Sequence, residues 1–297
     1  MKILLFCLIV LILITIILFI IKFFKYNDNE LYKSIKNVKY TGDYKIPKII
    51  HQVWLQGYDS LDSNIKNVIK ENLKMNLEWN YKFYDYEKID KFIKEHESQY
   101  VYNAFKKINP KYGAVVSDLF RYIIMYHEGG VYMDTKCKTN IPLDDWVHKN
   151  KLQFSFFGPT NILLNKYIDY KIFKNTSPRE IGQCFLLYPK NHEILRLLIN
   201  TITKKIYKFN NNNIINFFPN KIKNIYKIFT LTGPWIYTKV LLPYIINNIN
   251  DCIIYNKNEL DGFYNGYILY DGTNGKYHKK EHSKKKHYIH LKEKIIL

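Results

Sequence analysis

The sequence predicts one α/β domain with a mainly parallel central sheet, preceded by an apolar segment that is long enough to form a transmembrane helix. Strand-like and helix-like patterns alternate from residue 46 to residue 97, and this alternation is typical of α/β units. A longer helical pattern then ends at a double glycine, and a short apolar strand follows it. The 297 residues are 47% apolar and 24% charged, which excludes a wholly disordered or fibrous chain.

The first part of the domain contains two strands and two helices in alternation. Residues 46–55 are mostly apolar, as expected of a buried strand that opens the fold. Residues 60–75 carry apolar side chains at helical spacing, residues 79–84 alternate like a strand, and residues 86–97 are again helical. These elements predict the start of a largely parallel sheet.

The second part begins with a helix predicted at residues 112–127, which Gly129 and Gly130 end. Residues 131–134 then read as a short strand. Further along the chain we expect strands near 152–157 and 182–188 and helices at 192–205 and 234–246.

The N-terminal segment predicts an uncleaved membrane anchor within residues 1–21. Residues 3–21 are apolar except for Thr15, and as a helix they span ~28 Å, enough for a hydrocarbon core. No small-residue cleavage site follows. Residues 22–45 are polar and read as a stem. We therefore expect a single-pass membrane protein, of the Golgi or endoplasmic-reticulum type in a eukaryotic cell, with its orientation left open.

The charge balance points to anionic partners. Lys and Arg number 45 against 26 Asp and Glu, which gives a formal charge of +19 and favours nucleic acid, acidic membranes or phosphorylated small molecules. No nucleic-acid recognition signature accompanies it, so we expect no specific nucleic-acid binding. Residues 276–297 form a tail rich in His and Lys, with eight Lys and four His against two Glu. The four cysteines form no C-x-x-C pair, so a zinc ribbon is not expected.

The densest group of candidate site residues lies in the helix at 112–127 and the strand after it. Asp118, Arg121 and Tyr122 stand at i, i+3 and i+4 and share one helical face. One interpretation is a solvated ion pair; the apolar neighbours favour a partly buried pair that is positioned for a ligand. Asp134 ends the following strand, where α/β sheets tend to bind ligands.

Three blocks in this order resemble the DXD-containing glycosyltransferases of family 32: IPKIIHQVW at 46–54, SDLFRY at 117–122 and GGVYMD at 129–134. That family includes yeast-type α-mannosyltransferases and sphingolipid mannosyltransferases, and the blocks are more distantly similar to the glucosylating bacterial toxins. The likeness covers residues 46–143 and continues weakly through 182–185, 232–234 and the His-rich end. It implies a GT-A-like nucleotide-sugar-binding domain over residues 46–275, closed by the basic tail.

The resemblance also implies roles for individual residues. Trp54 would stack on the nucleotide base, although a core tryptophan that closes the first strand is the alternative. Asp118 and Arg121, with Tyr122 beside them, would bind the ribose or sugar of the donor. Asp134 would be the first acid of the DXD motif and would reach the ribose and a divalent cation, Mn²⁺ or Mg²⁺. The implied reaction is sugar transfer with retention of configuration to a glycan, lipid or protein acceptor.

One position departs from the family. The second acid of the motif is replaced by Lys136, and a lysine neutralises a diphosphate as a point charge. Three interpretations follow: the cation remains, held by Asp134, the diphosphate, water and a late histidine; Lys136 partly replaces the cation; or the protein is an inactive family member. His287 is the preferred late histidine, with His290 as a second choice. The rival function is a catalytically inactive GT-A-fold membrane protein that binds anionic surfaces through its basic tail.

Overall fold

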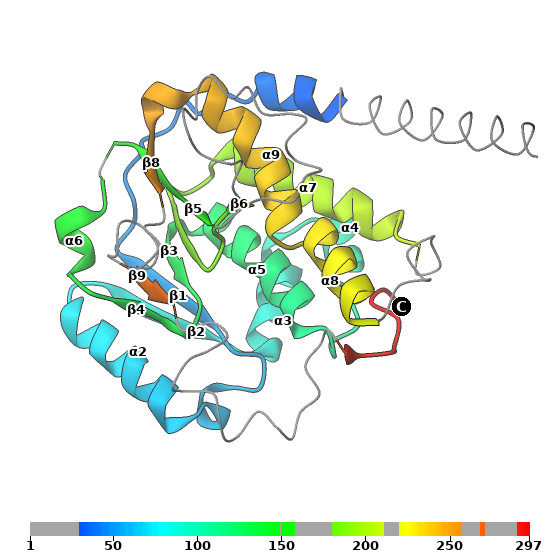
Figure 1. Ribbon diagram of the computed structural model, residues 1–297, viewed down its shortest axis with the longest axis horizontal. Helices are drawn as coiled ribbons and strands as arrows, with labels where there is room; N and C mark the ends of the chain where they lie inside the picture. Colours follow the sequence, from blue (N-terminus) through cyan, green and yellow to red (C-terminus); the bar gives the residue numbers. More distant parts are fainter. Residues whose placement is uncertain (1–29, 149, 158–179, 211–219, 257–267, 271–289) are drawn as a thin grey trace, which may run out of the picture.

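The computed structural model describes residues 30–148, 150–157, 180–210, 220–256, 268–270 and 290–297 (Figure 1). The anchor predicted at 3–21 and the candidate ligand His287 lie outside these residues. Within the described part of the chain, no helix combines the length and the apolar character that a membrane crossing needs.

The central sheet has four strands in the order β2-β1-β3-β7. Their bounds are Ile49–Val53 for β1, Asn80–Tyr84 for β2, Gly130–Met133 for β3 and Phe185–Tyr188 for β7. Strand β1 runs parallel to β2 and to β3, whereas β7 is antiparallel to β3. The predicted mainly parallel sheet is therefore confirmed for its first three strands, and the domain is a mixed α/β fold.

The first helices cover both faces of this sheet (Figure 1). They are α2 (Ser63–Met75), α3 (Tyr86–His96), α4 (Gln99–Lys106) and α5 (Gly113–His127). On one face, Ile65 and Ile69 of α2 pack near Phe83 of β2. On the other face, the ring of Tyr84 lies 4.9 Å from that of Phe120 in α5. Successive residues of β2 thus face opposite sides, as a strand requires.

The remaining elements form two small sheets and the helices that complete the core. A three-stranded sheet has the order β6-β5-β8, and β4 pairs with β9. The strands are β4 (Cys137–Thr139), β5 (Leu152–Phe157), β6 (Glu180–Ile181), β8 (Cys252–Asn256) and β9 (Ile268–Tyr270); the helices are α6 (Leu143–Trp146), α7 (Glu193–Tyr207), α8 (Asn220–Leu231) and α9 (Pro234–Asn247), with short 3-10 turns η1 (Tyr58–Ser60) and η4 (Ile249–Asp251).

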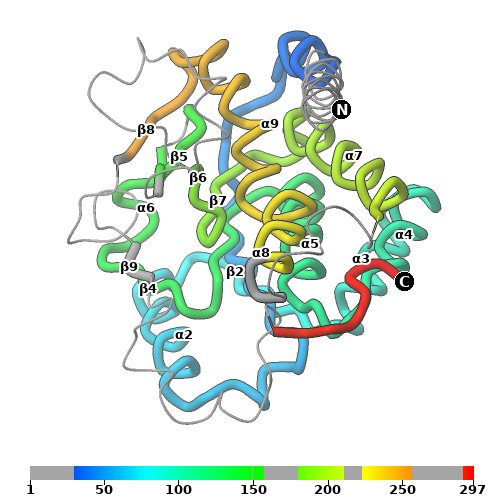
Figure 2. Tube along the Cα trace, turned by 45° about the vertical axis from the view of Figure 1, so that its right-hand side comes forward, coloured from blue at the N-terminus to red at the C-terminus, as the bar shows by residue number. Residues whose placement is uncertain are grey.

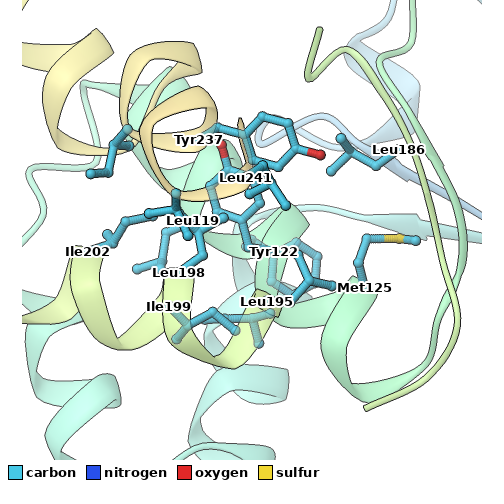
Figure 3. Packing of buried hydrophobic residues seen from close by; sticks show 14 of the residues in the cluster. Leu119, Tyr122, Met125, Leu186, Leu195, Leu198, Ile199, Ile202, Tyr237 and Leu241 are labelled. Atoms are coloured by element: carbon cyan, nitrogen blue, oxygen red, sulfur yellow. The ribbon is translucent and has the colours of Figure 1, made fainter. Parts of the chain in front are cut away.

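Helix α5 is the centre of the core. Leu119 and Tyr122 of α5 lie among side chains of α7 and α9, including Leu198 and Leu241 (Figure 3). Nearly every α5 side chain from Val115 onward to Met125 is buried. Asp118 and Arg121 are therefore buried because their helix is enclosed, and each needs a partner inside the protein.

Residues 30–45, which the sequence predicts as part of a stem, pack against the domain (Figure 2). Ile35 is 1% exposed and belongs to the main core cluster. The ring of Tyr40 stacks on His192, the residue that caps α7, with 4.4 Å between ring centroids. This part of the predicted stem is thus folded onto the domain, because its apolar side chains find a place in the core.

The C-terminal residues 290–297 lie beside the end of α4 (Figure 2). The main-chain N–H of Leu297 donates to the carbonyl of Lys107 at 2.8 Å, and Asn109 N–H donates to the carbonyl of Ile295 at 2.9 Å. The tail therefore closes back onto the connection that leads into α5.

Candidate functional site

The structure brings Asp118, Arg121 and Asp134 together at one end of the central sheet. Asp118 and Arg121 lie one turn apart on α5, and Asp134 follows directly after β3. Arg121 Nη2 is 3.1 Å from Asp118 Oδ1 and 3.4 Å from Asp134 Oδ1. The prediction that the helical pair is buried rather than solvated is confirmed, since their side chains are 5% and 7% exposed.

A tight turn between α5 and β3 sets this geometry. Gly129 and Gly130 have φ values of 65° and 94°, and a Cβ on Gly130 would lie 2.5 Å from the carbonyl oxygen of Ile49. Only glycine fits such a turn. His51 supports the turn because its Nε2 lies 2.9 Å from the carbonyl of Gly129. Burial lowers the pKa of His51 to about 4, so the ring is neutral and donates from Nε2.

Asp118 has donors on both carboxylate oxygens. Gln183 Nε2 donates to Oδ1 at 3.1 Å, on the oxygen that also faces Arg121. Thr232 Oγ1 donates to Oδ2 at 3.1 Å. Burial raises the pKa of Asp118 to about 6, while Arg121 and Thr232 act in the opposite direction and the charge of Asp134 adds to the rise. The site therefore holds a carboxylate that ionises near neutral pH.

Asp134 is the more exposed of the two acids, at 26% of its side chain. Its Oδ1 accepts from the hydroxyl of Tyr132 at 3.0 Å and faces Arg121. Its main-chain N–H donates to the carbonyl of Cys184 at 2.8 Å, which ties the strand end to the segment before β7. Because the protein holds Oδ1, Oδ2 is the oxygen through which Asp134 can bind a ligand.

Arg121 links the whole cluster. Its guanidinium lies 4.7 Å from the ring centre of Tyr132, and Nη1 donates to the carbonyl of Gln183 at 2.5 Å. Burial works to lower the pKa of Arg121, but Tyr132 and the two acids raise it well above its usual range. The Nε atom is buried and makes no hydrogen bond to any described residue. With both acids ionised, the cluster carries a net charge of −1.

Tyr122 points into the protein rather than toward open space. It is 0% exposed, and its hydroxyl lies 2.6 Å from Gln183 Oε1 and 3.0 Å from the carbonyl of Thr232. Tyr132, Gln183 and Thr232 complete the cluster without having been identified as site residues from the sequence. Each lies inside a motif or a weakly matching block, at 129–134, 182–185 and 232–234, and that position was the available signal.

Trp54 lies at the same edge of the sheet as Asp134, because β1 and β3 are parallel and each residue follows the end of its strand. Its indole N–H donates to Ser60 Oγ at 3.0 Å. The half-buried ring packs against the small cluster of Leu61, Ile65 and Ile69. The indole is thus half-buried at the expected edge of the sheet.

The described residues supply only part of a cation site. Lys136 is half-buried in the turn after Asp134. In this turn the main-chain N–H of Cys137 donates to the carbonyl of Asp134 at 2.8 Å. Asp144, an acid that follows Lys136 in the chain, pairs with Lys48 at 2.9 Å. His290 is exposed. Nowhere in the described ranges do three or more His, Cys, Asp or Glu gather in an arrangement that holds a metal.

Comparisons with known proteins agree with the motifs. Residues 59–153 match the family model for the glycosyltransferase sugar-binding region containing a DXD motif. This segment includes Asp118, Arg121 and Asp134. The resemblance to DXD glycosyltransferases is therefore confirmed for this stretch of the chain.

Two curated relatives share part of the chain. An uncharacterized glycosyltransferase, L373, of Acanthamoeba polyphaga mimivirus is 36% identical over 130 residues, 42% of this chain and 47% of that protein. Inositol phosphoceramide mannosyltransferase 1 of Schizosaccharomyces pombe is 32% identical over 108 residues, 35% of this chain and 32% of that protein. The chain thus matches less than half the length of each relative.

Among solved structures, the glycosyltransferase PaToxG has a TM-score of 0.41 at 15% identity, with 75% of this chain and 77% of that chain covered. The ligand-free glycosyltransferase domain of the YGT toxin has a TM-score of 0.44 at 12% identity, with 72% and 80% covered.

Proposed function

We propose that the protein is a glycosyltransferase that moves a sugar from a nucleotide-sugar donor, and that its α/β domain is GT-A-like. The observation that carries the proposal is the bridge of Arg121 between Asp118 and Asp134 at the edge of the sheet. Ligands of α/β sheets bind outside the carboxyl ends of the parallel strands. The three residues also fall within the segment that matches the sugar-binding family model.

The chemistry of the cluster suits a donor with hydroxyls and a diphosphate. Carboxylates accept hydrogen bonds from sugar or ribose hydroxyls, and a guanidinium donates to oxygen in a fixed geometry. Asp118 and Arg121 are held by buried partners, so they are preorganised before the donor binds. Trp54 offers an aromatic surface at the same sheet edge, on which the base of the donor would stack.

Asp134 would hold a divalent cation through Oδ2, with the remaining ligands from the donor diphosphate and water. A hard cation prefers such oxygen ligands and, when bound, neutralises the leaving diphosphate. Lys136 is two residues away and would contribute positive charge near the same phosphates. This chain's own contribution is to present one carboxylate oxygen from a rigid strand end, because Tyr132 and Arg121 hold the other oxygen.

The remaining features extend the proposal. Residues 3–21 would anchor the enzyme in a membrane, and transfer would proceed with retention of configuration. The acceptor would be a glycan, a lipid or a protein, and one matched relative is named for a lipid acceptor. The replacement of the second acid by Lys136 favours one alternative, a protein that keeps the fold, has lost turnover and binds anionic surfaces through its basic tail.

A panel of nucleotide sugars tests the proposal. The detergent-solubilised full chain is incubated with each donor and Mn²⁺ or Mg²⁺, and release of the nucleoside diphosphate is measured. We expect turnover with one donor, a loss of orders of magnitude in Asp134→Asn, and unchanged turnover in Asp144→Asn, whose carboxylate pairs with Lys48 outside the cluster. A folded wild-type chain that turns over no donor would refute the proposal and favour the inactive alternative.

A further inference from the structure

The junction between α8 and α9 holds two residues of α5 at once. The hydroxyl of Thr232 donates to Asp118 Oδ2 at 3.1 Å. The carbonyl of the same residue lies 3.0 Å from the hydroxyl of Tyr122, and it shares the single proton of that hydroxyl with Gln183 Oε1, which is 2.6 Å away. Asp118 and Tyr122 are one helical turn apart on α5, and Thr232 is 0% exposed. One buried residue therefore fixes α5 at two points next to the acidic cluster.

The main chain of this junction approaches Asp118 closely. A Cβ on Gly233 would lie 3.5 Å from Asp118 Oδ2 and 2.9 Å from Cα of Phe229. Gly233 is thus required by the tight turn at the end of α8, where a Cβ would collide with Phe229, and Pro234 then begins α9 directly. This turn places the Thr232 hydroxyl against the acid.

The two oxygens of Asp118 differ in how they are held. Oδ1 faces both Arg121 and Gln183, so it keeps one donor when the other moves. Among the described residues, the only donor within hydrogen-bond distance of Oδ2 is Thr232. Without that hydroxyl, a buried carboxylate oxygen would lose its partner, which costs more than the gain from a typical hydrogen bond. The carboxylate would then rotate or lose its charge.

We propose that Thr232 is a positioning residue for sugar transfer, which acts by fixing the orientation of the Asp118 carboxylate from the α8–α9 junction. The inference rests on the proposed function, because Thr232 would act through Asp118, which the proposed function places in the donor site. Thr232 itself contacts Asp118 and Tyr122. Its effect on the reaction should therefore disappear once Asp118 can no longer act as a carboxylate.

Two variants and a matched control test the role of the hydroxyl. Thr232→Val keeps the shape and removes the donor, and we expect kcat/KM to fall about 10- to 100-fold, as for loss of a hydrogen bond to a charged group. Thr232→Ser keeps the donor and should restore kcat/KM to within about threefold of wild type. Thr203→Val is the control, because Thr203 is equally buried and its hydroxyl donates only to the carbonyl of Ile199 in α7, at 2.8 Å.

The assay separates positioning from general destabilisation. The loss in Thr232→Val should appear in kcat, and thermal unfolding is recorded for every variant. In an Asp118→Asn background, adding Thr232→Val should lower kcat/KM by less than about twofold, because coupled residues are not additive. If Thr232→Val does not fold, Thr232→Ala removes the same hydroxyl without placing a methyl group against the acid.

Distinct results would overturn the two proposals. An inactive wild-type chain would refute the transferase itself and, with it, the role of Thr232. An active wild type whose Thr232→Val variant matches the Thr203→Val control would refute only the positioning role. The same conclusion follows if the losses from Asp118→Asn and Thr232→Val multiply, since Thr232 would then act through another group.

Discussion

Replacing Asp118 with Asn should lower turnover by orders of magnitude and, at neutral pH, leave the fold as stable as the wild type or more so. The amide has the shape of the carboxylate, and its oxygen can take the place of Oδ1 beside Arg121 and Gln183. Its NH₂ group would then face the Thr232 hydroxyl, which can rotate and accept. The buried cluster would change from a net charge of −1 to neutral, with Arg121 still paired to Asp134.

The magnitude follows from the pKa of Asp118. Burial raises this pKa from 3.8 to about 6 in the folded protein. Between these pH values the native state keeps a proton that the unfolded chain has lost, so wild-type stability falls by ~1.4 kcal/mol per pH unit as the pH rises. The full contribution is present below pH 3.8 and is lost above pH 6. The total is ~3 kcal/mol, and the Asn variant carries no such group.

The assay is thermal unfolding of wild type and Asp118→Asn from pH 4 to pH 8, without donor or metal. Relative to wild type, the variant should gain stability as the pH rises from 4 to 6, by about 5 °C in midpoint for a domain of this size, and the difference should then stay constant. A difference that does not change with pH would refute the reasoning, because Asp118 would then ionise alike in both states. An unfolded variant would show that the carboxylate is structural.

Three further predictions concern residues near the cluster. Lys136→Asp restores an acid two residues after Asp134, and we expect a lower Mn²⁺ concentration for half-maximal activity; an unchanged titration would place Lys136 beyond the reach of the cation. The stability of His51→Gln should be less sensitive to acid than that of the wild type, because the pKa of His51 falls from 6.5 to about 4 on folding. The wild type therefore loses ~3 kcal/mol of stability as the pH falls from 6.5 through 4. Parallel changes of the two melting temperatures over this pH range would contradict the prediction. Gly130→Ala places a Cβ 2.5 Å from the Ile49 carbonyl oxygen at a φ of 94°. Thermal unfolding should show that this variant is less stable by more than ~1 kcal/mol. An unchanged unfolding midpoint would show that the turn can relax.

Local sequence patterns predicted the elements of the fold whose formation depends on residues that are close in sequence. The strand at β1, the helix α5 and its end before the double glycine follow from apolar spacing and glycine, and the structure confirms them. The helices α4 and α8 were not predicted. Helix α4 has only eight residues, after the Ser98 cap, and such short helices depend on tertiary packing more than on their own propensity.

The same distinction applies to the site. Asp118 and Arg121 share a helical face, and Asp134 ends a strand, so their spacing alone made them candidates. Gln183 and Thr232 could not be derived in this way, because they lie 65 and 114 residues from Asp118 in sequence. Their role depends on the pairing of β3 with β7 and on the close approach at Gly233, which are long-range features.

If residues 3–21 form the predicted anchor, the packing of residues 30–45 limits how far the domain can stand from the membrane. With Ile35 in the core and the anchor predicted at 3–21, only eight residues, 22–29, remain as a tether. Fully extended, they reach at most ~28 Å. An enzyme on so short a tether would act only close to the lipid surface, and an acceptor would have to come near that surface to be glycosylated.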